Sequence, residues 1–404
     1  MSHYAMNVII NSITTIFQQR NNMKSLFIIF TFIFTLNISN LIAANNQDLY
    51  KKLDVFGDVF DLIKKNYVEE VDDEKVIEYA INGMLQSLDP HSGYMDAEIY
   101  VEMKEETKGE FGGLGIEVTM ENGFVKVISP IDDTPAAKAG MRPGDYITHI
   151  DGEGILGQSL QDAVEKLRGP VGSKIEITVV RLGEKDPLIV TIKRAIITVQ
   201  AVKYRPEGNV GYIRLISFSE QANKGVKEAI KNLNKEIGIN NLSGFILDLR
   251  SNPGGLLDQS AKVTNNFLGS GEIVSIKGRD KKDISRFSAS RGDLTDGKPL
   301  IVLINEGSAS ASEIVAGALQ DHKRAIVVGS QSYGKGSVQT IFPLSDSSAI
   351  RMTTALYYTP SGDSIHELGI SPDIEVESTW NTENQSDNQL EYALNLLREE
   401  IKIE

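Results

Sequence analysis

The sequence predicts a mixed α/β protein in which a helical region and a β-rich module precede a larger α/β domain. Three observations predict this fold class. The 404 residues are too many for one ordinary domain of about 150 residues. Hydrophobic residues make up 41% of the chain, which is enough to bury sizeable cores. From residue 210 onward, strand-like and helix-like patterns alternate, as is typical of α/β layers.

The composition excludes several kinds of site. The formal net charge is −14, from 41 basic and 55 acidic residues, and phosphate binding needs a basic surface, so nucleic acid is not an expected partner. The chain has no cysteine, which excludes disulfides, thiol nucleophiles and cysteine-bound zinc. None of the five histidines lies in a His-Glu-x-x-His pattern. We therefore expect neither a metal nor a cofactor.

An apolar run near the N-terminus predicts export. Residues 26–36 are almost entirely apolar, follow Lys24, and are followed by small residues at 43–44, which is the pattern of a secretory signal peptide. The run is shorter than the about 20 residues of a membrane-spanning helix, but apolar residues beyond it lengthen it, so an uncleaved membrane anchor stays open. We expect residues 1–44 to be a signal region, with 1–22 as an extension of the start site. The mature protein is then expected in the periplasm or cell envelope, with anchoring to the inner membrane as the open alternative.

The next segment, residues 45–108, is predicted to be helical. Apolar residues recur at helical spacing over 53–63 and again over 76–85. The following Asp89-Pro90-His91-Ser92 places an aspartate near a histidine. A turn with polar side chains explains this run better than a metal site does.

From residue 109 the chain changes to glycine-rich turns and short β-rich runs. Strands are expected over 174–181 and 188–193, after a short helix over 160–167. The glycines of Gly113-Leu114-Gly115-Ile116 let the backbone turn its N–H groups inward, which makes a nest for a carboxylate. A neighbouring strand edge can then accept an extended peptide. The alternative is a β-rich module whose glycines only make turns.

Three strand-like runs in the last 200 residues end in polar or glycine-rich loops. The runs are 244–250, 299–305 and 324–329. Ligands in open α/β sheets usually bind where strands end, so we expect the chemistry of the protein in these loops.

One of these loops partly matches a nucleotide-binding motif. Residues 329–335 fit the phosphate-loop pattern G-x-x-x-x-G-K. The next residue, however, is Gly336 instead of a serine or threonine that would bind magnesium. Residues 337–343 also read as a strand, so no helix begins where a phosphate would sit. Both mismatches argue against a nucleotide site.

A serine and a lysine in two of these loops favour nucleophilic catalysis. A serine hydroxyl needs a base to take its proton, and lysine can be that base only when it is neutral. Lys335 has no acidic neighbour in the sequence, and Ser310 opens a predicted helix whose free N–H groups favour negative charge. The Asn252–Gly255 loop can supply a second N–H. The alternative is structural, because Ser310-x-x-Glu313 is also a capping box.

The chain resembles the carboxy-terminal-processing, or tail-specific, serine peptidases over nearly all of the sequence after the signal region. The motifs that carry the resemblance lie in order along the chain: Leu88-Asp89-Pro90-His91-Ser92, a PDZ-like segment of the bacterial type, Asp248-Leu249-Arg250 with Gly254-Gly255, Ser308 to Glu313, and Gly334 to Gln339. The resemblance implies a ClpP/crotonase-like peptidase core over 196–376 and an inserted PDZ-like domain over 109–195. A polar linker and a C-terminal helix are expected over 377–404.

The resemblance also implies roles for individual residues. Ser310 would be the nucleophile, Lys335 the general base, and Gln339 the residue that positions the lysine. The oxyanion hole would use the N–H groups of Ala311 and of Gly254 or Gly255, while peptide tails would bind at Gly113, Leu114, Gly115 and Ile116. Ser308, Ser312 and Ser332 are expected to serve the structure.

The function that follows is an exported serine endopeptidase that recognises C-terminal tails of protein substrates and cleaves by a Ser–Lys dyad. The rival is a non-catalytic PDZ adaptor on a peptidase-like scaffold, which the presence of both Ser310 and Lys335 disfavours. An adaptor or activator protein, a homo-oligomer and membrane association through the N-terminal segment stay open as partners and states.

Overall fold

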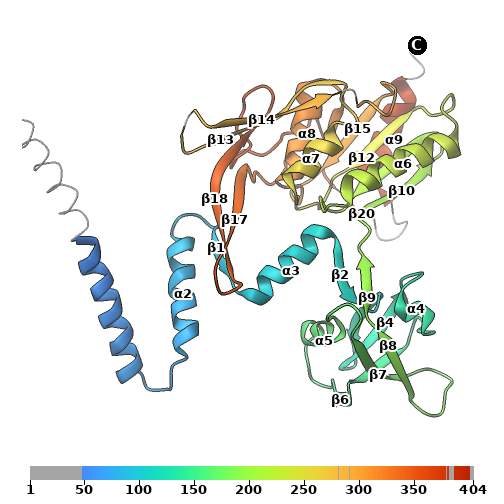
Figure 1. Ribbon diagram of the computed structural model, residues 1–404. Coiled ribbons are helices and arrows are strands. Elements are labelled where there is room, and N and C mark those ends of the chain that lie inside the picture. Colours follow the sequence, from blue (N-terminus) through green and yellow to red (C-terminus); the bar gives the residue numbers. More distant parts are fainter. Residues whose placement is uncertain (1–47, 281, 291, 379, 382–385, 401–404) are drawn as a thin grey trace, which may run out of the picture. The chain divides into compact units, whose positions relative to one another are not determined.

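The computed structural model describes residues 48–280, 282–290, 292–378, 380–381 and 386–400 (Figure 1). The chain divides into two compact units, residues 1–81 and 82–404. In the first unit, a helix covers residues 48–66, and α2 (Asp73–Gln86) begins there and ends in the second unit. The two runs of helical spacing therefore form helices. The expected signal segment lies outside the described residues, and none of the helices that are described is long and apolar enough to cross a membrane.

A β-rich module follows a helix, α3 (Ala97–Lys108), that Asp96 caps at its N-terminus. A five-strand path, β3-β4-β5-β7-β8, forms its sheet, β6 pairs with β5, and β2 pairs with β9. Its elements are β2 (Glu110–Gly113), β3 (Ile116–Glu121), β4 (Phe124–Pro130), α4 (Pro135–Lys138), β5 (Tyr146–Ile150), β6 (Glu153–Gly154), α5 (Leu160–Leu167), β7 (Lys174–Val180), β8 (Leu188–Lys193) and β9 (Ala195–Thr198). One apolar core holds the module together, and Ala163 and Leu167 of α5 are buried in it.

The larger domain is built on a six-stranded sheet of order β10-β11-β12-β15-β16-β19. The strand pair β10–β11 is antiparallel and the other pairs are parallel. The strands are β10 (Val202–Glu207), β11 (Val210–Leu215), β12 (Gly244–Asp248), β15 (Leu300–Ile304), β16 (Ile326–Gly329) and β19 (Ile374–Glu375). Every residue of β12 and β15 is buried, as expected for parallel strands covered on both faces.

Helices cover both faces of this sheet (Figure 1). Helices α6 (Ala222–Ile237), α7 (Leu257–Thr264) and α8 (Ala311–Asp321) bury apolar side chains in one core with alternate residues of the strands. Helix α9 (Asn388–Glu400) covers the other face, where Leu390, Ala393 and Leu397 share a core with the strands. The predicted mixed α/β core is confirmed.

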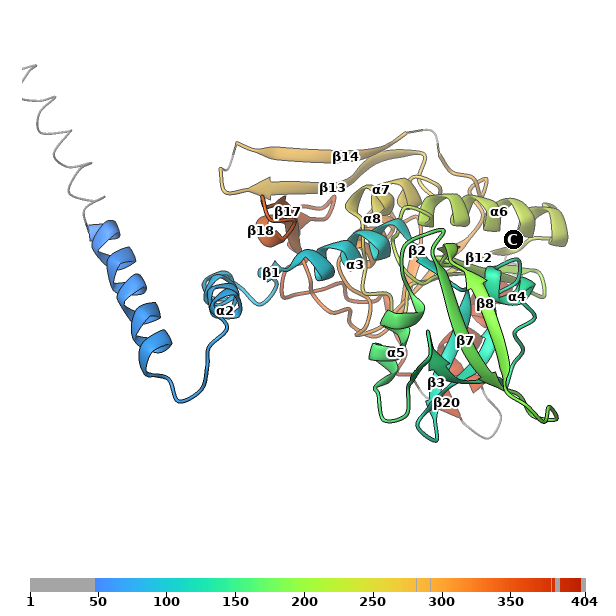
Figure 2. The ribbon, with the colours of Figure 1, turned by 60° about the horizontal axis from the view of Figure 1, so that its bottom comes forward.

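A second, antiparallel sheet carries the lysine loop. Its central strand is β18 (Ala349–Tyr358), which pairs along its length with β17 (Ser337–Pro343). The other edge of β18 pairs with β1 (Gly93–Met95) at one end and with β13 (Ser270–Gly278) at the other. Strand β14 (Ile284–Ser290) extends from β13 as a long hairpin (Figure 2).

A buried ion network joins the C-terminal segment to the sheet. Asp248, at the end of β12, accepts hydrogen bonds from the Tyr212 hydroxyl at 2.7 Å and from the Arg250 Nε at 3.0 Å. The Arg250 guanidinium also binds Asp387 at 2.7 Å and Gln389 at 3.0 Å. These last two residues lie in the stretch expected to be a linker, yet Gln389 is buried and Asp387 is partly buried against Arg250. The short strands β20 (Trp380–Asn381) and β21 (Ser386–Asp387) pair just before α9.

Candidate active site

Ser310 lies at the end of the loop that joins β15 to α8. Its backbone has φ 55° and ψ −111°, a conformation that is strained for a residue other than glycine by about 1–3 kcal/mol. The flanking serines hold this loop: the Ser308 hydroxyl donates to the Leu249 carbonyl at 2.8 Å and the Ser312 hydroxyl to the Asn252 carbonyl at 2.9 Å. These contacts agree with the structural roles expected for both flanking serines, and Ser310 is the serine held in the strained position.

The carboxylate of Glu313 binds both loops that carry the expected dyad. One oxygen accepts the N–H of Ser310 at 2.7 Å and the N–H of Lys335 at 2.9 Å. The other accepts the Ser332 hydroxyl and the N–H of Gly334, each at 2.6 Å. Burial raises the pKa of Glu313, against the effect of these four donors. Because three of the donors are backbone N–H groups, which only donate, the ionised carboxylate is the form that satisfies them all. The sequence showed only the capping-box half of this arrangement.

Lys335 lies two residues before the start of β17 and is partly buried. Burial lowers the pKa of its amine, and the positive charge of Arg351 on β18 lowers it further. The negative charge of Glu313 acts in the opposite direction. Lys335 has no acidic neighbour in the sequence, yet the fold brings Glu313 close to it. The net shift still favours the neutral amine, which a general base requires.

Tyr357 is a neighbour of Ser310 that sequence reasoning missed. Its side chain is 5% exposed, and its hydroxyl interacts with the Ser310 side chain. Burial raises the pKa of Tyr357 to about 12, so the phenol keeps its proton near neutral pH. Its backbone N–H donates to the carbonyl of Gly336 at 2.7 Å, next to Lys335. A tyrosine in an apolar strand run carries no signal of this role, because only the pairing of the strands brings it to the serine.

Gln339 lies on β17, four residues after Lys335. Its side-chain N–H groups donate to the hydroxyls of Ser337 and Thr353, both at 3.0 Å. The amide oxygen is therefore the atom left to accept a hydrogen bond from an ammonium group. That Gln339 positions the lysine stays a prediction.

The loop after β12 lies against the serine. A Cβ atom added to Gly254 would come within 2.9 Å of the Ser310 Cβ and 3.0 Å of the Ala311 nitrogen, so only glycine fits this close approach. The N–H of Gly254 donates to the Asn252 side chain at 2.9 Å. Gly255 forms a parallel bridge with Phe218. The bonds of this bridge are made by the Gly254 carbonyl and the Leu256 N–H, so the N–H of Gly255 points away from Phe218.

The four residues expected to bind peptide tails line one cavity in the β-rich module. Its volume is about 150 Å³, and it lies between β3 and α5. Gly113, Leu114, Gly115 and Ile116 form one wall, and Val164 and Leu167 of α5 contribute to the other. This is the arrangement in which an extended peptide can add to β3 with an apolar side chain in the cavity. Peptide binding there stays a prediction.

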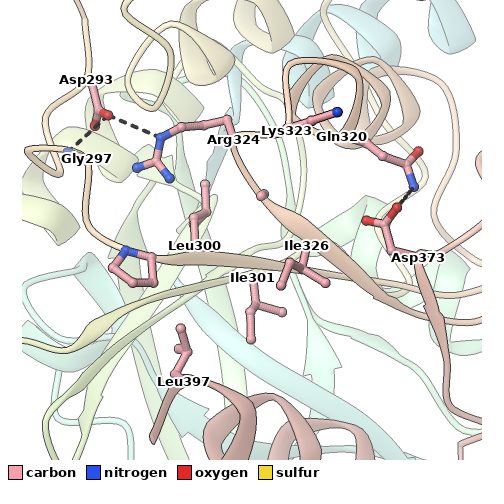
Figure 3. A pocket seen from close by; sticks show the side chains of 12 residues that line it. Asp293, Gly297, Leu300, Ile301, Gln320, Lys323, Arg324, Ile326, Asp373 and Leu397 are labelled. Carbon is pink, nitrogen blue, oxygen red and sulfur yellow. Dashed lines mark hydrogen bonds and ion pairs between the residues drawn. The ribbon is translucent and has the colours of Figure 1, made fainter. Parts of the chain in front are cut away.

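A larger cavity, of about 580 Å³, lies at the other end of the parallel strands (Figure 3). Leu300 and Ile326, at the beginnings of β15 and β16, line it, whereas Ser310 follows the end of β15. Four of its polar side chains pair with one another: Arg324 with Asp293 at 3.2 Å, and Gln320 with Asp373 at 2.9 Å. These groups satisfy each other, and the cavity contains no part of the expected dyad.

The fold and the site together define a modular serine peptidase: an α/β core with a serine at a strained helix entry, preceded by a PDZ-type module. Comparisons with known proteins support this class. A model of peptidase family S41 matches residues 209–376, and a PDZ domain model matches residues 126–181. A model of the N-terminal domain of the activating protease CtpB matches residues 36–99.

Two relatives and one solved structure illustrate the similarity. A carboxy-terminal-processing protease of Bartonella bacilliformis is 61% identical over 338 residues, which cover 84% of this chain and 78% of that protein. A probable CtpA-like serine protease of Staphylococcus epidermidis is 37% identical over 354 residues, covering 87% and 70%. A structure of the photosystem II D1 C-terminal processing protease is 30% identical, covers 80% of this chain and 92% of that chain, and has a TM-score of 0.47.

The chain belongs to the carboxy-terminal-processing serine peptidases of peptidase family S41. It is a serine-type endopeptidase with a PDZ domain, and both the expected family and the expected enzyme class are confirmed.

Proposed function

We propose that this peptidase cleaves its substrates with a Ser310–Lys335 dyad. The observation that carries the proposal is the Glu313 carboxylate, which accepts the backbone N–H of Ser310 at 2.7 Å and that of Lys335 at 2.9 Å. A single buried group thereby fixes the separation of the two loops. The lowered pKa of Lys335 supports its role as the base.

The reaction follows from these positions. The Ser310 Oγ attacks the carbonyl carbon of the scissile bond while Lys335 takes the serine proton. The bond from carbon to nitrogen breaks, and Lys335 gives the proton to the leaving amine. Water then attacks the acyl-enzyme, Lys335 accepts its proton, and the Ser310 oxygen leaves and is protonated again. Gln339, through its free amide oxygen, orients the lysine.

Two backbone N–H groups are proposed to bind the oxyanion. Ala311 is the first residue of α8, where the N–H groups have no partner inside the helix and the helix dipole is positive. Of the two glycines, Gly255 is the better second donor, because the N–H of Gly254 is held by Asn252. Gly254 instead provides the close approach to Ser310 and Ala311.

The PDZ domain is proposed to bind the C-terminal residues of protein substrates in the cavity between β3 and α5 and so to deliver tails to the peptidase core. Proteases of this kind are generally exported, and the apolar run at 26–36 supports export of this chain to the periplasm or cell envelope.

The direct test is cleavage of an unfolded protein that ends in apolar residues. Ser310→Ala and Lys335→Ala should each abolish cleavage. Lys203→Ala, which changes an exposed lysine on β10, should cleave like the parent. Mass spectrometry of the products gives the readout. Parent-like cleavage by the Ser310 or the Lys335 variant would contradict the dyad.

A further inference from the structure

The turn Asp89-Pro90-His91-Ser92 is internally braced. One oxygen of the Asp89 carboxylate accepts the N–H groups of His91 at 2.7 Å and Ser92 at 2.9 Å. The other accepts the Ser92 hydroxyl at 2.8 Å. Ser92 is 3% exposed. These bonds fix the direction in which the Ser92 hydroxyl points, because its proton is given to the carboxylate.

The braced turn is attached to β18, more than half the chain away. The Ser92 Oγ accepts the N–H of Thr353 at 3.1 Å, and the carbonyl of His91 accepts the Nε of Arg351 at 3.1 Å. Directly after the turn, β1 pairs with β18 in a register that sets Gly93 opposite Arg351. The turn therefore holds two alternate residues of β18, and one of them is the arginine whose charge acts on Lys335.

Thr353, which the turn holds, in turn contacts Gln339. The two residues are opposite one another in the β17–β18 pairing, and the Gln339 Nε2 donates to the Thr353 Oγ at 3.0 Å. Partial burial of Asp89 acts to raise its pKa, yet the hydrogen bonds from Ser92 and the His91 N–H, together with the nearby Thr353 hydroxyl, hold the pKa below its usual value. Because a carboxylate only accepts, the charge of Asp89 favours a Thr353 hydroxyl whose proton faces that carboxylate. The Thr353 oxygen is then an acceptor for Gln339.

This order of donors decides which way the Gln339 amide faces. Its NH₂ group must point to Thr353 and Ser337, and its oxygen must point away from them. A flipped amide would place two acceptor oxygens, those of Gln339 and Thr353, against each other. The charge of Asp89 thus orients the Ser92 hydroxyl directly, and it favours the orientation of the Thr353 hydroxyl that lets this oxygen accept from Gln339.

We propose that the turn 89–92 is a positioning element for the lysine base, in which Asp89, Ser92 and Thr353 fix the orientation of the Gln339 amide and the place of Arg351. This inference rests on the proposed dyad, because it assigns the turn a role through Gln339 and Lys335. It gives a function to a motif that otherwise reads as a polar turn.

The test compares three variants of neighbouring threonines in the full chain. Thr353→Val keeps the shape and removes the hydroxyl, whereas Thr353→Ser keeps the hydroxyl. Thr354→Val is the matched control. The Thr354 hydroxyl makes a similar cross-strand bond, to Thr340 at 2.6 Å, but it takes no part in the contacts that lead from Asp89 to Gln339. We expect Thr353→Val to lower kcat about tenfold with KM unchanged. Thr353→Ser should restore most of kcat, and Thr354→Val should match the parent.

A second pair of variants tests the charge. Asp89→Asn places an NH₂ group where the Ser92 proton now points and removes the charge that favours the direction of the Thr353 proton, so it should lower kcat with KM unchanged. Asp96→Asn changes the N-cap of α3, where its carboxylate accepts the N–H of Ile99 at 2.8 Å and asparagine caps equally well, so its kcat should equal that of the parent.

Equal losses of kcat in Thr353→Val and Thr354→Val would overturn the inference, since they would indicate a general effect on the strand pair. So would a Thr353→Ser variant as slow as Thr353→Val, or an Asp89→Asn variant as fast as the parent. Ser310→Ala and Lys335→Ala are measured alongside. If these two abolish cleavage while the Thr353 variants behave like the parent, the dyad stands and only the role of the turn is wrong.

Discussion

The side-chain carboxylate of Glu313 accepts a hydrogen bond from the backbone N–H of Lys335 at 2.9 Å. The same oxygen accepts the N–H of Ser310. The acid that lies near the lysine thus accepts hydrogen bonds from backbone N–H groups, and these bonds hold the lysine loop in position. Its negative charge only partly offsets the effect of burial on the pKa of Lys335.

Replacing this acid should disable the enzyme and weaken the fold. In Glu313→Gln, an NH₂ group takes the place of one oxygen and faces N–H donors, which leaves buried donors unsatisfied at a cost of about 1–3 kcal/mol each. We expect a lower Tm and a kcat reduced about 100-fold, since small misplacements of reacting groups have effects of that size. Glu306→Gln, at an exposed position of the loop that precedes α8, is the control. A Glu313→Gln variant with parental kcat would refute the positioning role.

Removing the charge of Arg351 should change the pH dependence. The guanidinium lowers the pKa of Lys335, so Arg351→Gln should raise that pKa and leave less neutral amine at a given pH. The rising limb of kcat/KM against pH should therefore move to higher pH. Because Arg351 is exposed, the loss of rate on that limb should be at most about fivefold, or roughly 1 kcal/mol. Arg205→Gln, on β10, should leave the profile in place, and a shift to lower pH would contradict the assignment.

Two adjacent tyrosines allow the contact with the nucleophile to be tested. Tyr357→Phe removes the hydroxyl that interacts with Ser310, and we expect kcat to fall about tenfold. Tyr358→Phe keeps the ring on which the Lys277 ammonium sits, 3.6 Å from the ring centroid, and should behave like the parent. Steady-state kinetics on a peptide substrate provides the measurement. Equal rates for the two variants would show that the Tyr357 hydroxyl has no part in the reaction.

The loop of the PDZ domain that is proposed to bind carboxylates contains a glycine with no room for a side chain. Gly115 has φ 78°, and an added Cβ would lie 2.3 Å from the Thr134 side chain. Gly140 has φ 77° and open space around it. Both alanine variants strain the left-handed backbone, but only Gly115→Ala must also displace the Thr134 side chain. Binding of a fluorescent tail peptide should be lost in Gly115→Ala and retained in Gly140→Ala. Similar affinities would show that the clash is relieved without cost.

The sequence was most informative where a pattern is local. The periodicity of residues 160–167 gave helix α5 with its bounds, and the run 337–343 gave strand β17. Ordered motifs led to the family and to Ser310 and Lys335. Contacts between distant strands left no such trace: Tyr357, Arg351 and Thr353 reach the site only through the pairing of β18, and nothing near them in the sequence indicates it. Asp387 and Gln389 read as linker residues for the same reason, because their partner Arg250 is far away in the chain.

Strand β18 presents Arg351 and Thr353 on one face, because they are two residues apart, whereas the extra residue between Thr353 and Ala355 in the pairing with β17 places Tyr357 on the opposite face. Insertion or deletion of a single residue before Arg351 would turn every one of them to the opposite face at once. Substitutions at residues 350, 352 and 354 change none of these three directions. In a diverging lineage, the composition of the strand at these positions is therefore less constrained than its length, and a laboratory library that varies residues 350, 352 and 354 should retain far more active members than one that varies the length of the β17–β18 turn.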